Sequence, residues 1–438
     1  MPSCFINIYR KLFVVFQTLS LVILVNLLLS GCASYSLNFK QIEAKIAAKN
    51  YPAALKTLDD NKGPQRDSVL YWMNRGMILR MSGNYTQSNQ AFEQAKTISQ
   101  QITATSVSEQ AGALSISDGL RSYDGQSFEK IYLHVYKALN YLEQNDLQNA
   151  RVEALQIDVK FNEMNDDGFK DDPFARYLMG IVFEAQQEWS DALIAYRKAY
   201  NNYQSKQKIF SIPLPKTLQQ DLLRLTAKEN FKQEHQTYSK RFKNIKWPKA
   251  SELAQKGELI IIFHNSLMPA KGEQFISTAG KKGVLIRIST PFYQRKPVHV
   301  RQIKVKTNRS ITPGNIVEDL TAVGQHTLAR QTPAIIARAI SRAVVKTSVT
   351  SELERKNELA GMVANIAGLL TERADTRAWS TLPQNIHIAR VPLSPGTYNA
   401  DVQLVGYQNN IIHTEKLTNL NIRKGKKLFK SIHFISAR

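Results

Sequence analysis

The pattern of apolar and polar positions changes near residue 250 and divides the chain into two regions. Before that point, apolar residues recur in a register that is typical of helices. After it, apolar and polar residues alternate over short runs such as 284–288 and 398–404, which is typical of strands. The sequence therefore predicts an α+β protein. In this prediction residues 32–250 form a helical domain, and residues 251–438 form an antiparallel β-rich domain with a helical insertion at about 314–372.

Two segments of the helical region place small and aromatic residues in the same order. Counted from Gly76 and from Gly180, they share small, aromatic, small, aromatic and alanine positions at offsets 0, 9, 12, 16 and 19. A weaker copy surrounds Ala138. The order resembles the tetratricopeptide repeat, a helix–turn–helix unit in which small residues let helices approach and aromatic residues fill the gaps. The alternative is a generic helical bundle. The residues expected at these contacts are Gly76, Tyr85, Phe92, Ala95, Ala138, Gly180, Trp189, Ala192, Tyr196 and Ala199.

The segments on either side of these repeats carry weaker signals. Residues 50–55 predict the turn and second helix of an incomplete first unit, and 101–127 and 162–172 predict insertions. Pro213 and Pro215 interrupt the helical pattern, which resumes over Leu218–Arg241. We therefore expect one last helix and a connector before residue 250.

The second region predicts strands and one helical stretch. The strand candidates are Glu258–Phe263, 284–288, Val298–Val305, Ile386–Ala389, Tyr398–Leu404 and Phe429–Phe434. In the helical stretch, Ile336, Ile340 and Val344 form an apolar stripe. Arg338, Arg342 and Lys346 form a parallel basic stripe. This pattern predicts an amphipathic helix.

The start of the chain has the order of an export signal. Arg10 and Lys11 precede an apolar run, Leu12–Leu29, which ends in Leu29-Ser30-Gly31-Cys32. This ending resembles the lipobox of bacterial lipoproteins. The resemblance implies removal of residues 1–31, a diacylglycerol thioether on Cys32 and acylation (palmitate) of its new amino group. A single membrane-spanning helix and an ordinary secreted protein are the alternatives.

The residues that follow Cys32 indicate a location. Ala33 and Ser34 come next, where enterobacterial lipoproteins kept in the inner membrane carry Asp. The resemblance therefore implies a lipid-anchored protein of the outer membrane that faces the periplasm. Several acyl chains anchor a protein stably to a membrane.

The formal net charge of +22 is concentrated in the second region, where 27 Lys and Arg face 12 Asp and Glu. Nine basic residues and no acidic residue lie between Glu273 and Glu318. A basic surface attracts anions. In an exported protein we expect anionic lipid, lipopolysaccharide or peptidoglycan rather than nucleic acid, and simple solvation of the charges is the alternative. The candidate anion-binding residues are Lys281, Lys282, Arg287, Lys304, Lys306 and Arg309.

One further string resembles a known family. Asp375, Arg377 and Trp379 lie in Glu372-Arg373-Ala374-Asp375-Thr376-Arg377-Ala378-Trp379, which precedes Leu382-Pro383 and Pro395-Gly396-Thr397-Tyr398. With the lipobox and the repeats, the string resembles an uncharacterised family of proteobacterial repeat-containing lipoproteins, which implies work in the cell envelope. The three side chains predict either a structural joint between helix and sheet or a ligand pocket.

The sequence lacks recognisable catalytic or metal-binding motifs, so we expect no catalytic residue, no metal and no cofactor. The eight histidines lack metal-ligand spacing, and His264-Asn265-Ser266 has no supporting partner motif. The prediction is a non-catalytic scaffold whose repeat groove binds a protein partner in cell-envelope assembly or maintenance. A peptidoglycan- or lipopolysaccharide-binding protein is the main alternative, and an unrecognised cell-wall enzyme is the weaker one.

Overall fold

The computed structural model describes residues 34–108, 121–164, 171–279, 285–356 and 373–436. Its helices are α2 (Ser34–Ala47), α3 (Tyr51–Asp60), α4 (Ser68–Met81), α5 (Tyr85–Ser108), α6 (Ser127–Glu143), α7 (Leu147–Glu163), α8 (Pro173–Ala185), α9 (Trp189–Phe210), α10 (Lys216–Lys228), α11 (Lys232–Arg241), α12 (Ala250–Ala254) and α13 (Leu320–Lys356), with a short 3-10 turn at Gln65–Asp67. Helices come first and strands follow, so the predicted fold class is confirmed.

The helices pair in hairpins that share one turn geometry. Five turns place a residue with positive φ two positions before the second helix begins. These residues are Lys49 (φ 55), Gly83 (φ 82), Asn145 (φ 57), Gln187 (φ 66) and Asn230 (φ 59). The last of them separates α10 from α11, so the expected single helix over Leu218–Arg241 is wrong. The described residues thus contain a fifth hairpin in place of a single last helix, and residues 242–249 connect it to α12.

Glycine brings the two helices of a hairpin together at two positions. A Cβ atom added to Gly76 would lie 2.4 Å from Cε1 of Phe92, and one added to Gly180 would lie 2.3 Å from the ring of Tyr196. Both aromatic rings are fully buried. In the third hairpin Ala138 is buried as well. Small residues therefore set the close approach of α4 to α5 and of α8 to α9. The remaining predicted repeat residues Ala95, Ala192 and Ala199 are buried, and Tyr85 and Trp189 are half-buried.

The strands form two four-stranded sheets and a separate hairpin. The inner sheet has the order β10-β1-β7-β6 and the outer sheet has the order β5-β4-β8-β9, and within the described part of the chain β2 pairs only with β3. The strands are β1 (Gly257–Asn265), β2 (Lys271–Ala279), β3 (Leu285–Tyr293), β4 (Gln302–Thr307), β5 (Ile311–Pro313), β6 (Asn315–Asp319), β7 (Asn385–Leu393), β8 (Gly396–Val405), β9 (Ile411–Ile422) and β10 (Lys427–Phe434). The pair β1–β10 is parallel and all others are antiparallel. Because residues 315–319 pair with β7, the helical insertion begins at Leu320, later than predicted.

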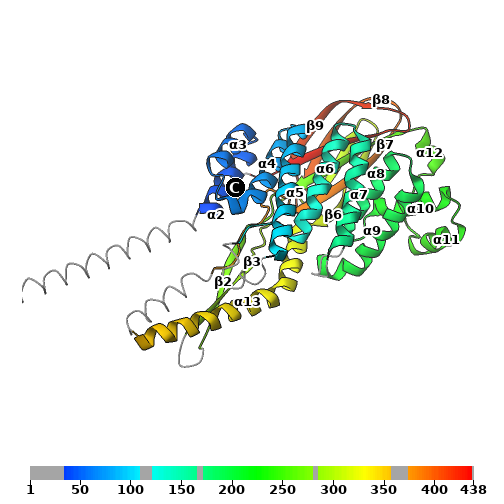
Figure 1. Ribbon diagram of the computed structural model, residues 1–438. Coiled ribbons are helices and arrows are strands. Elements are labelled where there is room, and N and C mark those ends of the chain that lie inside the picture. The colour runs from blue at the N-terminus through cyan, green and yellow to red at the C-terminus, as the bar shows by residue number, and fades with distance from the viewer. Residues whose placement is uncertain (1–33, 109–120, 165–170, 280–284, 357–372, 437–438) are drawn as a thin grey trace, which may run out of the picture.

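The inner sheet lies between the helices and the outer sheet. All nine residues of β1 are buried. Leu259, Ile261 and Phe263 belong to a core with outer-sheet residues, whereas Ile260 and Ile262 join a core with helical residues. Figure 1 shows the helices packed along the strands, with α13 and the β2–β3 hairpin extending away from this body. Among the described residues, no helix is both long and apolar enough to cross a membrane.

Candidate functional site

The face of the repeats that was expected to form a groove is occupied by the chain itself. We call α4, α6 and α8 the first helices of their hairpins, and α5, α7 and α9 the second helices. Every residue from Pro173 to Glu184 in α8 is buried, and α6 is buried along almost its whole length. The inner sheet covers them. The hydroxyl oxygen of Tyr136 in α6, for example, lies 3.3 Å from Nδ1 of His264 in β1. The described residues therefore leave no open groove on this side, and a groove for a protein partner stays a prediction.

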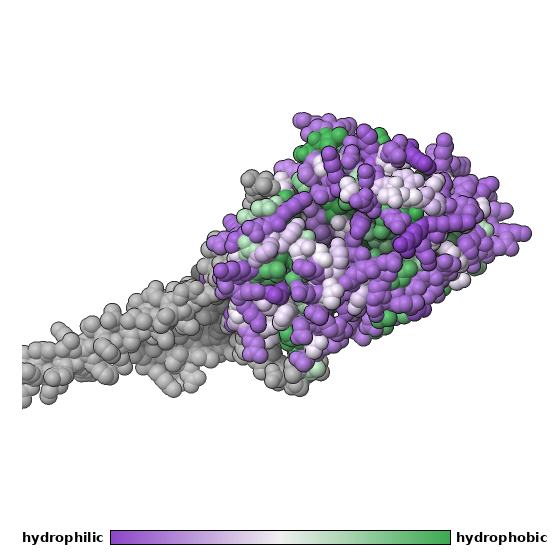
Figure 2. Space-filling view, turned by 90° about the horizontal axis from the view of Figure 1, so that it is seen from above, coloured by the Kyte–Doolittle hydropathy of each residue, from purple (hydrophilic) through white to green (hydrophobic). Residues whose placement is uncertain are grey.

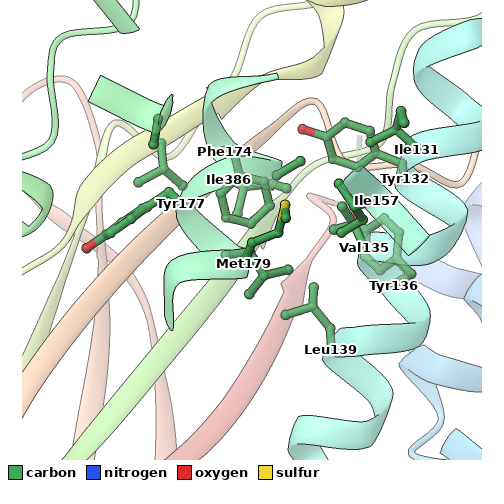
Figure 3. Close-up of a cluster of buried hydrophobic side chains, with 14 of the residues drawn as sticks. Ile131, Tyr132, Val135, Tyr136, Leu139, Ile157, Phe174, Tyr177, Met179 and Ile386 are labelled. Carbon is green, nitrogen blue, oxygen red and sulfur yellow. The ribbon is translucent and has the colours of Figure 1, made fainter. Parts of the chain in front are cut away.

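Apolar side chains from both halves meet at this contact. Figure 3 shows Tyr132, Val135 and Leu139 of α6 in one cluster with Phe174 of α8 and Ile386 of β7. All are almost completely buried. A single core therefore joins the helices to the inner sheet, and the two predicted domains pack as one body.

A network of six buried charges crosses the same contact. Arg390 of β7 donates to Glu258 of β1 (2.7 and 2.8 Å) and to Asp221 of α10 (2.5 Å). The other three members are Glu184 of α8, Arg224 of α10 and Lys427 of β10. Lys427 lies 2.8 Å from Glu184, and Arg224 lies 2.9 Å from it. Three acids thus face three bases, and the network ties two helices to three strands.

The network favours the charged forms of Glu258, Glu184 and Arg390, whereas burial raises the pKa of Asp221 above its ordinary value. Burial alone would raise the pKa of Glu258, but Arg390 and Lys427 lower it to about 2. Glu184 is likewise buried, and Arg224, Lys427 and Arg390 hold its pKa well below its ordinary value. Burial opposes the charge of Arg390, yet Asp221, Glu258 and Glu184 raise its pKa well above its ordinary value. These groups stabilise one another as ions, which is a structural role.

The string containing Asp375, Arg377 and Trp379 holds the second half to the first helices. Arg377 donates to both carboxylate oxygens of Asp375 (2.8 Å each) and to Asp67 (2.8 Å). Trp379 is fully buried, and its backbone N–H donates to Glu129 of α6 (2.8 Å). The geometry therefore supports the predicted structural joint rather than a ligand pocket.

Two histidines, the buried His264 and the half-buried His433, form a second polar cluster between the helices and the inner sheet. The rings of His264 and His433 stack with centroids 4.2 Å apart, next to Tyr136 and the fully buried Arg80. Burial and the positive charge of Arg80 hold the pKa of both histidines well below 6.5. His264 is therefore a neutral packing residue, and the described residues bring together no three His, Cys, Asp or Glu side chains that could hold a metal ion.

The outward side of the second helices carries an apolar stripe. Val152, Leu155 and Val159 of α7 are 49%, 40% and 42% exposed. Their spacing of three and four places them on one side of the helix. Ile194 of the neighbouring helix α9 is also exposed, and Asp158 and Lys198 pair beside it (3.2 Å). We call these four apolar residues the α7 stripe. No sequence motif singled them out, because three apolar positions on a helix ordinarily mark its buried side.

The candidate anion-binding residues only partly share a surface. Lys304 and Lys306 lie on the same face of β4, since the alternate residues Ile303 and Val305 are buried. Lys306 stands opposite Asp401 of β8 in the register, so an acid from elsewhere in the chain reaches the acid-free segment. Arg309 lies over the ring of Tyr398 (5.8 Å). Of the remaining candidates, Lys281 and Lys282 lie outside the described residues, as does Cys32, and the side chain of Arg287 is not described.

Other basic residues of the same segment pair with distant acids. Lys296 lies 3.3 Å from Glu43 of α2, and Arg295 pairs with Asp319. In the C-terminal cluster, Lys427 belongs to the buried network and Lys430 lies 3.6 Å from Glu143. The excess of base in the sequence is therefore reduced by contacts between the halves.

Comparison with known proteins yields only distant structural similarities. No family model matches the chain, and no curated protein sequence does. Among solved structures, MamA 41-end from Desulfovibrio magneticus RS-1 is 12% identical, with a TM-score of 0.32 over 49% of this chain and 94% of that chain. The apo form of RapI is also 12% identical, with a TM-score of 0.37 over 49% of this chain and 54% of that chain. The resemblance to a lipoprotein family therefore stays a prediction.

Proposed function

We propose that this protein is a lipid-anchored, non-catalytic interaction protein of the bacterial outer membrane that serves cell-envelope assembly or maintenance. The motif ending in Cys32 supports the anchor. A non-catalytic role is supported by the way its buried charges are used. The ions around Arg390 neutralise one another between layers of the fold, and Arg377 fastens one half to the other.

The α7 stripe is the observation that carries the proposal of a protein partner. The covered first-helix face leaves the second helices as the accessible side of the repeats. Most of the described surface in Figure 2 is hydrophilic, as expected for a protein in water. A row of three exposed apolar residues at helical spacing suits an apolar helix of a partner laid against α7. The lysines beside the stripe pair with acids of this chain, Lys198 with Asp158 and Lys160 with Glu163, so apolar packing carries the proposed contact.

Site-specific crosslinking in cells tests this surface. A photoreactive amino acid at Leu155 should yield a crosslinked product whose partner, identified by mass spectrometry, also captures this protein in the reciprocal experiment. Gln90 is exposed on the second helix α5 and serves as the matched control position. A lack of specific product at 152, 155 and 159 would contradict the proposed docking surface.

The anchor requires a separate experiment. Cys32→Ser should abolish incorporation of labelled palmitate and leave an unprocessed precursor. If the variant still incorporates label and fractionates with the outer membrane, the lipoprotein assignment is wrong.

A second candidate function is binding of an anionic glycan or lipopolysaccharide to the outer sheet. The shared exposed face of Lys304 and Lys306 favours it. Attraction between exposed charges is screened beyond roughly 8 Å at physiological ionic strength. Binding to sacculi or lipopolysaccharide should therefore weaken steeply with salt and weaken further in the variant Lys304→Glu with Lys306→Glu. Binding that is indifferent to salt would contradict this candidate.

A further inference from the structure

The β2–β3 hairpin and α13 form a projection, which we call the arm. Among the described residues its two strands pair only with each other, and α13 packs along β3. Figure 1 shows α13 and the hairpin running side by side away from the layered body. The arm therefore presents surfaces that no other sheet covers.

The far part of α13 departs from the usual orientation of an amphipathic helix, whereas Leu328 nearer its start is buried as usual. Ile340 is 46% exposed, whereas Arg342 is 3% exposed and Ala339 is buried. The hairpin shows the same feature, because Ile276 of β2 is 51% exposed and Phe292 of β3 is also exposed. A helix that faces only water places arginine outward and isoleucine inward. This arm directs large apolar side chains outward.

The charge of the arm is of one sign over a long stretch. From Leu320 to Ser351 the sequence of α13 contains four basic residues and no acidic one. Of these, Arg330 is exposed and Arg338 is half-buried, whereas Arg342 is buried. Apolar side chains combined with basic residues are the composition of segments that lie in the interface of an anionic membrane.

The base of the arm lies next to the first helix after Cys32. Glu43 of α2 is 3.3 Å from Lys296, three residues beyond the end of β3. Gln325 of α13 donates to the carbonyl oxygen of Tyr293 (3.4 Å), so the start of α13 meets the same place. The helix α2 begins at Ser34, two residues after Cys32. Glu43 lies nine residues after Ser34, which is about 14 Å along the helix, so the base of the arm is near the helix that would carry an acyl anchor.

We propose that the arm lies on the membrane surface, with Ile276, Phe292 and Ile340 in the interfacial region of a bilayer that contains anionic phospholipid. This inference rests on the proposed lipid anchor for its location, and it adds a second membrane contact to that anchor. The acyl chains hold the protein at the membrane, and the arm fixes how the body is oriented above it. A second copy of the chain is the occupant that the test must distinguish from lipid.

Vesicle binding by the acyl-free chain tests the arm independently of the anchor. The mature chain with Cys32→Ser should float with vesicles of phosphatidylethanolamine and phosphatidylglycerol, and much less with phosphatidylcholine vesicles. Ile276→Ser with Ile340→Ser should reduce the bound fraction at limiting lipid about tenfold, because each isoleucine loses apolar burial. The matched control is Val152→Ser with Leu155→Ser on the α7 stripe, which should leave vesicle binding unchanged.

A fluorescent label reports the contact directly. The chain has only two cysteines, and the mature Cys32→Ser chain has none. An environment-sensitive dye on Ile340→Cys should shift to the blue when anionic vesicles are added, whereas the same dye on Leu155→Cys should not. This measurement requires only that the labelled protein keep the wild-type melting temperature.

The outcomes separate the two proposals. No vesicle binding by the wild-type acyl-free chain, or no dye shift at residue 340, overturns the arm while leaving the palmitate result of Cys32 untouched. Dimerisation without vesicles that Ile276→Ser with Ile340→Ser abolishes would assign the surface to a second copy instead. If the wild type incorporates no palmitate but the acyl-free chain still binds vesicles, the proposed anchor is wrong and the proposed membrane contact of the arm stands.

Discussion

The two sides of the same helical hairpins have opposite surroundings. On the first-helix side, α6 and α8 are buried against the inner sheet, and buried ions such as Glu184 and Arg390 cross the contact. On the second-helix side, α7 presents its apolar stripe to water. A repeat pattern in the sequence is therefore informative about how two helices pair, and silent about what covers each side of the pair.

The comparison shows where rigidity and recognition reside. On the covered side, apolar side chains and ion pairs join the two halves of the chain. The uncovered side keeps an apolar surface that the fold does not use. We therefore expect substitutions on the first side to change stability, and substitutions on the second side to change binding.

The largest contrast between the two sides is expected for two arginines that each pair with a glutamate. Arg390→Met removes the centre of the buried network and leaves Glu258 and Asp221 without their main partner. We expect a loss of about 3–5 kcal/mol of unfolding free energy. Arg151→Met breaks the part-exposed pair with Glu188 (2.7 Å) on the other side, which should cost about 0–1 kcal/mol. Urea unfolding of both variants measures the difference, and equal losses would contradict the comparison.

The stacked histidines give the first-helix side a dependence on acid. Their pKa in the folded protein is depressed below 6.5, so the unfolded chain binds their protons first as the pH falls. Stability is then fully present above pH 6.5 and is lost as the pH falls from there toward the folded pKa, by about 1.4 kcal/mol per histidine and pH unit. Melting temperatures between pH 7.5 and 5.5 should therefore decline more steeply in the wild type than in His433→Gln.

An exposed histidine supplies the control for this dependence. His299 is exposed after β3, and His299→Gln should keep the wild-type decline. The groups around the stacked pair are Arg80 of α4, Tyr136 and Glu143 of α6, and Lys430 of β10. If the melting temperature of the wild type does not change between pH 6.5 and 5.5, the folded and unfolded chains bind the same number of protons at this cluster, which would contradict the prediction.

Local features of this fold could be predicted from sequence, whereas contacts between distant segments could not. Gly76 and Phe92 lie 16 residues apart within one hairpin, and the period that joins them repeats along the chain. Arg390 meets Glu184 across 206 residues, and no periodicity relates the two positions. The parallel pairing of β10 with β1 is likewise set by tertiary packing.

The arm shows a different limit of sequence patterns. The spacing of Ile340 and Arg342 predicts that they lie on different sides of a helix, but the pattern does not say which side faces the protein. The usual assumption buries the isoleucine, and the structure buries Arg342. Which neighbours a helix packs against decides which side is buried, and the sequence of the helix alone does not contain that information.

The close contact between the first and second helix of a hairpin depends on the lack of a side chain at Gly76 and Gly180. Gly76→Ala would place a methyl group 2.4 Å from the buried ring of Phe92, and Gly180→Ala would meet Tyr196 at 2.3 Å. We expect each to cost about 1–3 kcal/mol by overpacking, although alanine favours a helix over glycine by about 1 kcal/mol. Combining Gly76→Ala with Phe92→Leu should recover part of the loss in a double-mutant cycle. A stabilised Gly76→Ala variant would mean that the helices can separate freely.

The smallest effect on stability is expected at the α7 stripe, and it is the most informative about function. Leu155→Ala removes apolar atoms that already contact water, so its unfolding free energy should stay within about 0.5 kcal/mol of the wild type. Leu139→Ala on the buried side of α6 removes the same atoms and should cost about 2–5 kcal/mol. If Leu155→Ala nevertheless loses the partner crosslinked from a photoreactive amino acid at Val159 while its melting temperature is unchanged, the stripe acts in recognition and has no role in folding. If Leu155→Ala instead destabilises the protein as much as Leu139→Ala does, the outward side of the hairpins is covered in solution, and the contrast between the two sides disappears.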